Sequence, residues 1–206
     1  LCRADEIALV MQFVDKYWAK GHVLAHDRAL TDWQHRRSDG SYNFVVATRK
    51  DDPEPLAVLG FIPTTRYDPA LSAHETVWLA LWKVRPDASS AGLGRAGLRY
   101  MTAMHPGSAI GVGGIGPAEH IAMYRALGFA TGQLSQYYML DATRVDFHLA
   151  RVPTPVAARA VPAGNARLTP LSEDEVLAAT ERVGRTLKAS SWPLKTPGYF
   201  KGRFFG

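Results

Sequence analysis

A glycine-containing turn between an apolar strand and a helix is the strongest candidate for chemistry in this sequence. The run from Trp78 to Val84 is apolar, and residues 84–98 read Val-Arg-Pro-Asp-Ala-Ser-Ser-Ala-Gly-Leu-Gly-Arg-Ala-Gly-Leu. Gly92 and Gly94 lie where the helix is expected to begin. The first N–H groups of a helix lack helical partners and lie at the positive end of its dipole. A turn of this kind is therefore suited to binding phosphate.

The spacing of these glycines excludes two common nucleotide motifs. The segment does not read Gly-x-x-x-x-Gly-Lys-Ser/Thr, and it lacks the third glycine of the dinucleotide-binding fingerprint. A turn that binds nothing stays open as an alternative, because glycine also serves tight turns and close packing.

The order strand, Val-x-Pro, a few irregular residues, Gly-x-Gly and apolar helix resembles the acyl-CoA pyrophosphate loop of the GNAT acyltransferase superfamily. A second segment, residues 117–129, reads Pro-Ala-Glu-His-Ile-Ala-Met-Tyr-Arg-Ala-Leu-Gly-Phe. It is similar to the family's other signature helix, Ala-x-x-x-Tyr-x-x-x-Gly-Phe, with Tyr124, Gly128 and Phe129 at the matching places. The resemblance covers residues 5–141 or thereabouts.

The resemblance implies acetyl-CoA or another acyl-CoA as cosubstrate, and it implies where that molecule would bind. The pantetheine arm would pair with the backbone of Leu81 to Val84, as a strand does. Backbone N–H groups of residues 89–95 would hold the pyrophosphate. The family usually has Arg or Gln at the place of Ser89, so part of the anion contact is expected to pass to Arg95. The residues implied for cofactor binding are Leu81, Trp82, Lys83, Val84, Ser89, Gly92, Leu93, Gly94 and Arg95.

The same resemblance implies catalytic roles for two residues. Tyr124 would be the general acid, because a phenol with a pKa near ~10 can protonate a departing thiolate whose conjugate acid has a pKa near ~8.5. Glu75 lies close to the place of the family's carboxylate base, although Trp78 stands at the most usual position. The alternatives are a packing role for Tyr124 and a solvated carboxylate for Glu75. His105 is expected to be solvated or to cap a helix.

His22 and His26 are four residues apart, a spacing that can bind metal on a helix. No third ligand has suitable spacing, and Gly21 predicts that the first helix has already ended, so no metal is expected. By resemblance, this segment and Trp33 would instead line the pocket of the acceptor substrate. The alternative is that Trp33 is a core residue and His35 a surface residue.

A finer resemblance concerns the acceptor. Several short segments are similar to bacterial GNAT proteins of surface-polysaccharide biosynthesis, some of which acylate the amino group of a nucleotide-linked deoxyamino sugar. The resemblance therefore implies an amino-sugar N-acyltransferase. The open alternatives are a peptide, antibiotic or small-amine acceptor, and a CoA-binding module without catalysis. The segments are Trp18-x-x-x-His22, Asp32-Trp33-Gln34, Leu59-Gly60-Phe61-Ile62-Pro63, Trp78-x-x-x-Trp82-Lys83-Val84 and Gln136-Tyr137-Tyr138.

Composition limits the class of protein. The 206 residues include 47% hydrophobic ones, and no apolar run approaches the ~20 residues that would span a membrane. One cysteine excludes an internal disulfide and fits a reducing, cytoplasmic compartment. The net charge of +5 is scattered, which favours small polyanions over nucleic acid as partners. We expect acyl-CoA and a small amine as partners, without nucleic acid; a monomer and a homodimer stay open.

The chain begins Leu1-Cys2-Arg3, without an initiator Met or a signal-peptide pattern, so we expect a cut chain. Cys2 is expected to lie on a fraying terminus, which disfavours it as a nucleophile.

Apolar spacing predicts the elements that must position these groups. Their order predicts a mixed sheet flanked by helices, and the resemblance implies an α/β (α+β) GNAT fold with a mixed, mostly antiparallel sheet of six to seven strands. The sheet would be splayed between the strands that the family numbers four and five, here 76–84 and 109–113. The expected helices are 5–19, 27–37, 92–104 and 117–127, and the expected strands are 42–48, 56–62, 76–84, 109–113, about 129–140 and 145–152.

A change in composition predicts the domain boundaries. Residues 1–152 would form the GNAT acyltransferase domain, 153–166 an Ala- and Pro-rich linker, and 167–206 the start of a second module or a C-terminal extension. Ser172 and Glu175 form the pattern of a capping box. The aromatic tail either folds back onto the first domain or opens a second module, and we favour the second. Its aromatic residues are Trp192, Tyr199, Phe200, Phe204 and Phe205.

Overall fold

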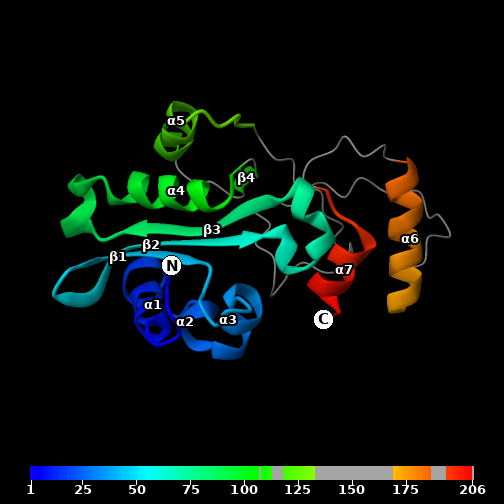
Figure 1. Ribbon diagram of the computed structural model, residues 1–206, viewed down its shortest axis with the longest axis horizontal. Helices are drawn as coiled ribbons and strands as arrows, with labels where there is room; N and C mark the ends of the chain where they lie inside the picture. Colours follow the sequence, from blue (N-terminus) through cyan, green and yellow to red (C-terminus); the bar gives the residue numbers. More distant parts are fainter. Residues whose placement is uncertain (107, 113–117, 133–168, 187–193, 206) are drawn as a thin grey trace, which may run out of the picture. The chain divides into compact units, whose positions relative to one another are not determined.

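The computed structural model describes residues 1–106, 108–112, 118–132, 169–186 and 194–205 (Figure 1). By contacts between residues, the chain divides into two units. One unit combines Leu1–Gly114 with Ser172–Gly206, and the other is Ile115–Leu171.

The first unit is built on a four-stranded mixed sheet with the order β1-β2-β3-β4. β1 to β3 are antiparallel neighbours, and β4 runs parallel to β3. The first two strands form the predicted hairpin, in which Arg49 pairs with Asp52. All four strands lie where the sequence predicts them. They are β1 (Phe44–Arg49), β2 (Asp52–Pro63), β3 (Thr76–Val84) and β4 (Ala109–Val112).

The predicted count of six to seven strands is not confirmed. Residues 133–168, which hold most of the two remaining predicted strands, lie outside the described residues. Residues 129–132 are described and have no regular structure, so the strand expected at about 129–140 does not begin at Phe129.

Helices cover both faces of the sheet (Figure 1). On one face lie α1 (Ile7–Phe13), α2 (Val23–His26) and α3 (Arg28–His35). The other face is covered by α4 (Leu93–Met104), which packs on β1, β2 and β3. α1 buries Ile7, Val10 and Phe13, as expected of a helix that flanks a sheet, whereas α3 buries the polar residues Thr31 and His35.

Two of these helices differ from the prediction. The helix expected over residues 5–19 changes at Val14 into a π-helical turn, η1 (Val14–Trp18). The helix expected over residues 27–37 is α3, which ends two residues earlier, at His35; Asp27 caps its start by accepting a hydrogen bond from the N–H of Leu30 over 2.8 Å.

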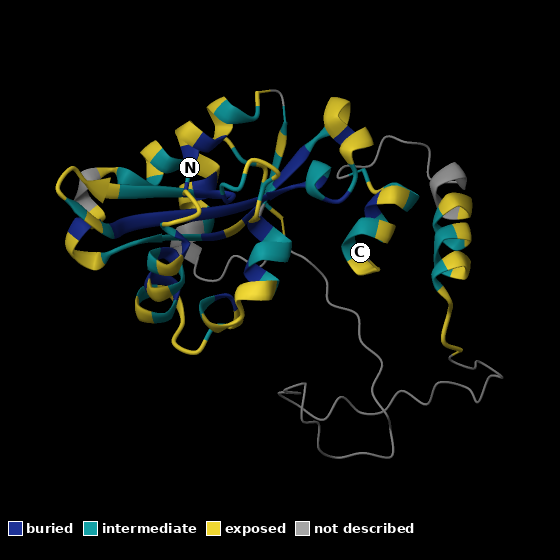
Figure 2. Ribbon diagram, turned by 60° about the horizontal axis from the view of Figure 1, so that its bottom comes forward, coloured by how far each residue is buried: buried dark blue, intermediate teal, exposed yellow. Residues whose placement is uncertain are grey.

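The core lies between the helices and the central strands, where Figure 2 shows the buried residues of β2 and β3. Cys2 is fully buried in this core. Its N–H donates to the carbonyl of Phe44, at the start of β1, over 2.8 Å, and its carbonyl accepts from the N–H of Tyr42 over 2.9 Å. The expected fraying of this terminus is therefore wrong. Burial raises the pKa of the Cys2 thiol to about 12, which makes it a weak nucleophile.

On α4 the buried residues are Leu98 and Met101. The helix expected over residues 92–104 is therefore confirmed as α4. Gly97 lies on the side of this helix that faces β1, where a Cβ would meet Cγ1 of Val45 at an ordinary contact distance of 3.8 Å.

The C-terminal residues Ser172–Gly206 belong to the first unit, together with Leu1–Gly114. The capping box is confirmed at the start of α6 (Glu173–Thr186), where Ser172 N donates to Glu175 Oε2 over 2.7 Å. The last helix, α7 (Pro197–Phe204), buries Tyr199 against the short helices η2 (Thr64–Arg66) and η3 (Pro69–His74). Residues 196–204 of the aromatic tail therefore pack on the first part of the chain, which is the alternative in which the tail folds back.

Two glycines explain how α7 comes so close. A Cβ on Gly198 would lie 2.7 Å from Oδ2 of Asp68, and one on Gly202 would overlap the carbonyl oxygen of Tyr67. One helical turn apart, they form a flat surface against the η2–η3 segment. The guanidinium of Arg203 lies over the ring of Tyr67, 4.9 Å from its centroid, and bonds to its hydroxyl.

None of the helices among the described residues is both long and apolar enough to cross a membrane.

Candidate functional site

The turn between β3 and α4 consists of a short 3-10 helix, η4 (Pro86–Ala91), followed by Gly92. Gly92 has a φ of +68°, a left-handed conformation that glycine adopts without a Cβ penalty. No side chain among the described residues caps α4. The N–H groups of Leu93, Gly94 and Arg95 therefore begin the helix without helical partners, which is the predicted anion-binding arrangement.

Gly94 brings α4 close to β3. A Cβ at this position would lie 3.0 Å from Nε1 of Trp82 and 3.3 Å from two further atoms of the indole. The two glycines therefore have different local causes, since Gly92 makes the turn and Gly94 accommodates Trp82. Together they fix the start of α4 directly beside the end of β3.

Among the described residues, β4 covers only part of the edge of β3. Four residues of each strand pair, and Leu79 opposite Val112 is the last of these described pairs. The next residue, Ala80, is an extra residue on β3, because the register against β2 shifts there. A bulge bends a strand, and this bulge directly follows the last described β3–β4 pair. Beyond it, in the described part of the chain, the far edge of Leu81–Val84 has no strand beside it, as the predicted pairing with pantetheine requires.

The side chains predicted to assist at the turn contribute less than its backbone. The Ser89 hydroxyl donates to the carbonyl of Pro86 over 2.9 Å, within η4. Arg95 is exposed in the first turn of α4, where a cation can attract a phosphate. Lys83 is partly buried at the end of β3.

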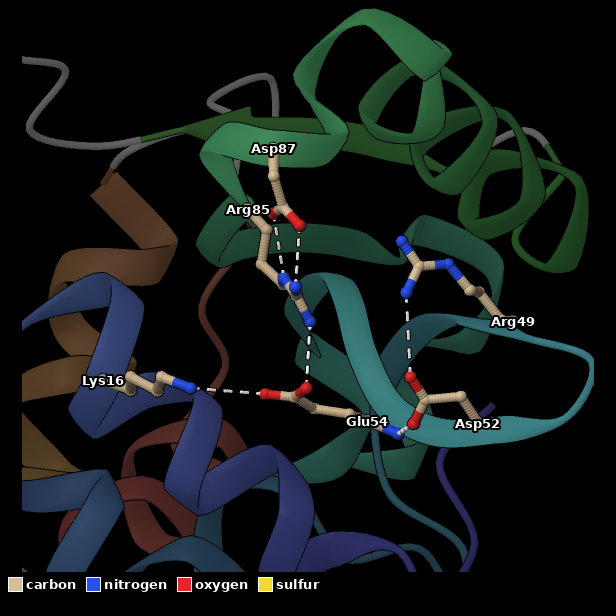
Figure 3. A network of polar contacts seen from close by, with 6 residues as sticks. All are labelled: Lys16, Arg49, Asp52, Glu54, Arg85 and Asp87. Atoms are coloured by element: carbon tan, nitrogen blue, oxygen red, sulfur yellow. Dashed lines mark hydrogen bonds and ion pairs between the residues drawn. The ribbon is translucent and has the colours of Figure 1, made fainter.

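A charged residue that the sequence analysis did not single out lies beneath the turn. The guanidinium of Arg85 bonds to both carboxylate oxygens of Asp87, at 3.0 and 2.7 Å, and to Glu54 on β2 at 3.1 Å (Figure 3). The hydrogen bonds with Asp87 raise the pKa of Arg85 further above its usual range. Glu54 in turn lies 3.4 Å from Nζ of Lys16. This network joins the turn to strand β2 and to the π-helical turn η1.

Glu75 is held by three donors at the start of β3. Its Oε1 accepts from the hydroxyl of Thr65 at 2.5 Å, and its Oε2 accepts from His105 Nδ1 at 2.8 Å and from the Ser108 hydroxyl at 3.0 Å. These bonds, with that from His105 the strongest, hold the pKa of Glu75 down to about 2. A carboxylate stabilised in this way is a weak base. At about 3.3 Å per residue, Glu75 is also about 16 Å along the strand from Ala80.

His105 is the C-cap of α4, where its N–H donates to the carbonyl of Thr102 over 3.2 Å, so the expected capping role is confirmed, but its side chain is not solvated. Its ring is paired with Glu75, lies edge-on to Phe61 with a centroid distance of 5.4 Å, and is mostly buried. Its Nε2 is buried and has no hydrogen-bond partner among the described residues. No sequence signal could reveal this pair, because 30 residues separate the two members and only the fold brings them together.

Tyr124 lies on α5 (Ala118–Ala126), in the second unit. Its side chain is buried, and its ring is edge-on to Phe129 at 5.3 Å. Burial raises the pKa of the phenol above its ordinary value, which keeps it protonated at neutral pH. Gly128 follows the helix with a φ of +89°, a left-handed conformation typical of glycine at a helix end, and Met123 is exposed. The role of Tyr124 as general acid stays a prediction.

The two histidines of the predicted acceptor segment have local partners. His22 is the N-cap of α2, and its Nδ1 accepts from the N–H of Leu24 over 3.2 Å. His26 lies with its Nε2 3.0 Å from Oδ1 of Asp15. Among the described residues, no group of three His, Cys, Asp or Glu side chains could hold a metal ion.

Trp33 and His35 lie on α3 in different environments. Trp33 packs against the cluster that contains Tyr199, and the guanidinium of Arg203 is 5.3 Å from its ring centroid. His35 is fully buried against the ring of Phe44 at 4.3 Å, so its expected surface position is wrong. Burial lowers the pKa of His35 to about 4.

The structure thus brings together Trp82, the edge of Leu81–Val84, and the start of α4 at Gly92–Arg95. It places Glu75 at the opposite end of β3. Of the predicted sites, the anion-binding turn is the one whose residues lie close together.

Solved structures to which this chain is similar include two acetyltransferases. One is an acetyltransferase of Trypanosoma brucei, 12% identical, with a TM-score of 0.46 over 67% of this chain and 95% of that chain. The other is an aminoglycoside acetyltransferase from an uncultured soil metagenomic sample, 15% identical, with a TM-score of 0.46 over 68% of this chain and 95% of that chain. No protein-family model and no curated protein matches the sequence.

Proposed function

We propose that this protein is an acyl-CoA-dependent N-acyltransferase that transfers an acetyl or other short acyl group to the amine of a nucleotide-linked amino sugar. The observation that carries the proposal is the geometry of β3, its bulge and the turn into α4. In the described part of the chain, the edge of Leu81–Val84 has no strand beside it, and it leads into a left-handed Gly92 and a helix start that no described side chain caps. These features match the two parts of CoA, an amide-containing arm and a pyrophosphate.

The residues present fit CoA at this place. Nothing lies within 4 Å of the position that a Cβ on Gly92 would take, so the first N–H groups of α4 can be approached. Arg95 is exposed beside them and adds a positive charge. The pantetheine amides would bond to the free backbone edge of β3, and this contact requires no particular side chain.

The reaction would be a direct attack of the amine on the thioester within one complex. A new C–N bond forms, the C–S bond breaks, the amine loses a proton and the thiolate gains one. Tyr124 is the proposed donor to the thiolate. Backbone N–H groups near the bulge at Ala80 are the proposed donors to the thioester oxygen.

We do not assign the base to Glu75, because its three donors and low pKa suit it to holding β3, α4 and β4 together. An acceptor amine that loses its proton to water before it binds needs no carboxylate of the protein. Nor does the transfer need a covalent intermediate, and the buried Cys2 could not easily form one.

The acceptor is proposed to bind along the segment that contains His22, His26 and Trp33. What supports an amino sugar is the resemblance of the short segments around Trp18, Trp33 and Trp82. The proposal therefore has two parts, a CoA site supported by geometry and an acceptor supported by sequence.

The decisive experiment crosses several acyl-CoAs with a panel of nucleotide-linked amino sugars and follows release of the CoA thiol. We expect turnover with at least one amino sugar and none with a matched sugar that lacks the amine. Turnover only with peptides or polyamines would overturn the acceptor. CoA binding without turnover on any amine would overturn the enzyme assignment in favour of a binding module.

A further inference from the structure

The π-helical turn η1 (Val14–Trp18) contacts two regions that the proposed function assigns to different substrates. π-helical turns are rare, and they occur often at functional sites. On one side, Lys16 lies 3.4 Å from Oε1 of Glu54, and the ring of Tyr17 lies under the guanidinium of Arg85, 5.5 Å from its centroid. These contacts reach the residue from which the anion-binding turn begins.

On its other side, η1 holds the segment that follows it. Oδ1 of Asp15 accepts a hydrogen bond from the N–H of Gly21 over 2.7 Å and lies 3.0 Å from Nε2 of His26. Gly21 has a left-handed φ of +74°, so the chain reverses there before His22 starts α2. The path of Gly21–His26 is thus fixed by a carboxylate of the π-helical turn.

Arg85 is built to hold the turn in place. Its side chain is 13% exposed, and three of its nitrogen atoms bond to carboxylate oxygens of Asp87 and Glu54 (Figure 3). Bidentate contact with Asp87 orients the first turn of η4, because the planar guanidinium fixes both oxygens at once. Two carboxylates already offset its charge, so Arg85 positions the turn and leaves the anion to backbone N–H groups.

We propose that η1 couples the anion-binding turn to the Gly21–His26 segment, with Arg85 as the positioning residue between them. The contacts are continuous from Asp87 through Arg85 to η1, and from Asp15 to Gly21 and His26. Ordering one end therefore restricts motion at the other, and the coupling acts equally in both directions. The ligands involved are those of the proposed function, on which this part of the inference rests: CoA bound at the turn would order the Gly21–His26 segment, where the acceptor is proposed to bind.

Hydrogen exchange of the full chain without ligand tests the coupling directly. Arg85→Gln should speed amide exchange about tenfold at residues 15–26 as well as at 86–92, the change expected when charge-assisted hydrogen bonds are lost. Arg49→Gln is the matched control, because Arg49 forms an exposed pair with Asp52 across the same hairpin and does not contact η1 (Figure 3). Faster exchange confined to residues 86–92 in the Arg85 variant would overturn the coupling.

Glu54→Gln is a second, milder variant, since it removes one charge from a side chain that is about half exposed. It should speed exchange at residues 15–26, whereas Asp52→Asn should not. Equal exchange in these two variants would count against the relay through Glu54.

Adding CoA separates this inference from the proposed function. Slower exchange at both 86–95 and 15–26, with the second effect lost in Arg85→Gln, supports the proposed site and the coupling together. Slower exchange at 86–95 alone overturns the coupling and leaves the CoA site standing. No CoA binding overturns the proposed function, and the ligand-free comparison then decides the coupling by itself.

Discussion

Glu75 accepts a hydrogen bond from Nδ1 of His105 over 2.8 Å, and this contact joins the start of β3 to the residue that follows α4. A carboxylate only accepts, so this nitrogen of His105 carries the proton. The pair lies at the end of β3 remote from the Gly92 turn. Its first consequence is therefore for stability.

Glu75 should make stability depend on acidic pH. Its pKa is lowered to about 2 from an ordinary 4.5, so its contribution is complete above about pH 4.5 and is lost as the pH falls toward 2. Glu75→Gln should lower the free energy of unfolding by about 1.5–3 kcal/mol at pH 7, and by less at pH 3. Urea unfolding at both values measures this, with exposed Glu181→Gln as control. Equal losses at pH 7 and pH 3 would contradict the account.

Two glycines near the start of α4 should respond oppositely to alanine. Gly92→Ala forces a Cβ into a left-handed turn and should destabilise the protein by about 1–2 kcal/mol. Gly97→Ala places a Cβ at ordinary distance from Val45 within a helix and should stabilise it by about 0.5–1 kcal/mol. Urea unfolding of both variants measures the two changes, and a stabilising Gly92→Ala would show that the turn is not left-handed.

The fold-back of α7 should depend on Gly202. Alanine there would overlap the carbonyl of Tyr67, so Gly202→Ala should destabilise the protein by about 1–3 kcal/mol. Lys201→Ala, on the exposed side of the same helix, should change stability by less than about 0.5 kcal/mol. Thermal unfolding compares the two. CoA affinity should stay within a few-fold in both variants, since α7 does not contribute to the proposed CoA site.

Tyr124→Phe should lower turnover by about 10²–10⁴-fold and leave CoA affinity almost unchanged, because only the phenolic proton is lost. In the wild type the rate should rise as the acceptor amine loses its proton. It should fall only above the ordinary tyrosine range, because burial raises the pKa of Tyr124. The falling limb should be absent in the variant. Full activity of Tyr124→Phe at every pH would leave this residue with a packing role alone.

The local parts of the fold could be predicted from the sequence, because their causes are local. The N-cap at Asp27, the capping box at Ser172 and the left-handed Gly128 each depend on neighbours within a few residues. The four strands follow from their apolar runs. The turn at Gly92 was found in the same way, from glycine spacing and the strand before it.

What could not be predicted depends on contacts between distant segments. His105 meets Glu75 only because α4 ends beside the start of β3. Arg85 reaches Glu54 because β2 and β3 pair in one register, and the bulge at Ala80 is a property of that register. The burial of a single polar residue also cannot be predicted from its neighbours in the sequence. His35 lies between polar residues, yet its ring is buried in the core.

Calorimetric titration with CoA tests the central claim most directly, in the wild type and in two glycine variants of α4. We expect the wild type and Gly97→Ala to bind CoA with similar affinity. Gly94→Val should bind at least about 100-fold more weakly, because its side chain would meet Trp82 and displace the first N–H groups of the helix. At 100 times its Kd, CoA should also raise the free energy of unfolding of the wild-type protein by about 2.7 kcal/mol. Unchanged CoA affinity in a folded Gly94→Val variant would contradict the proposed site.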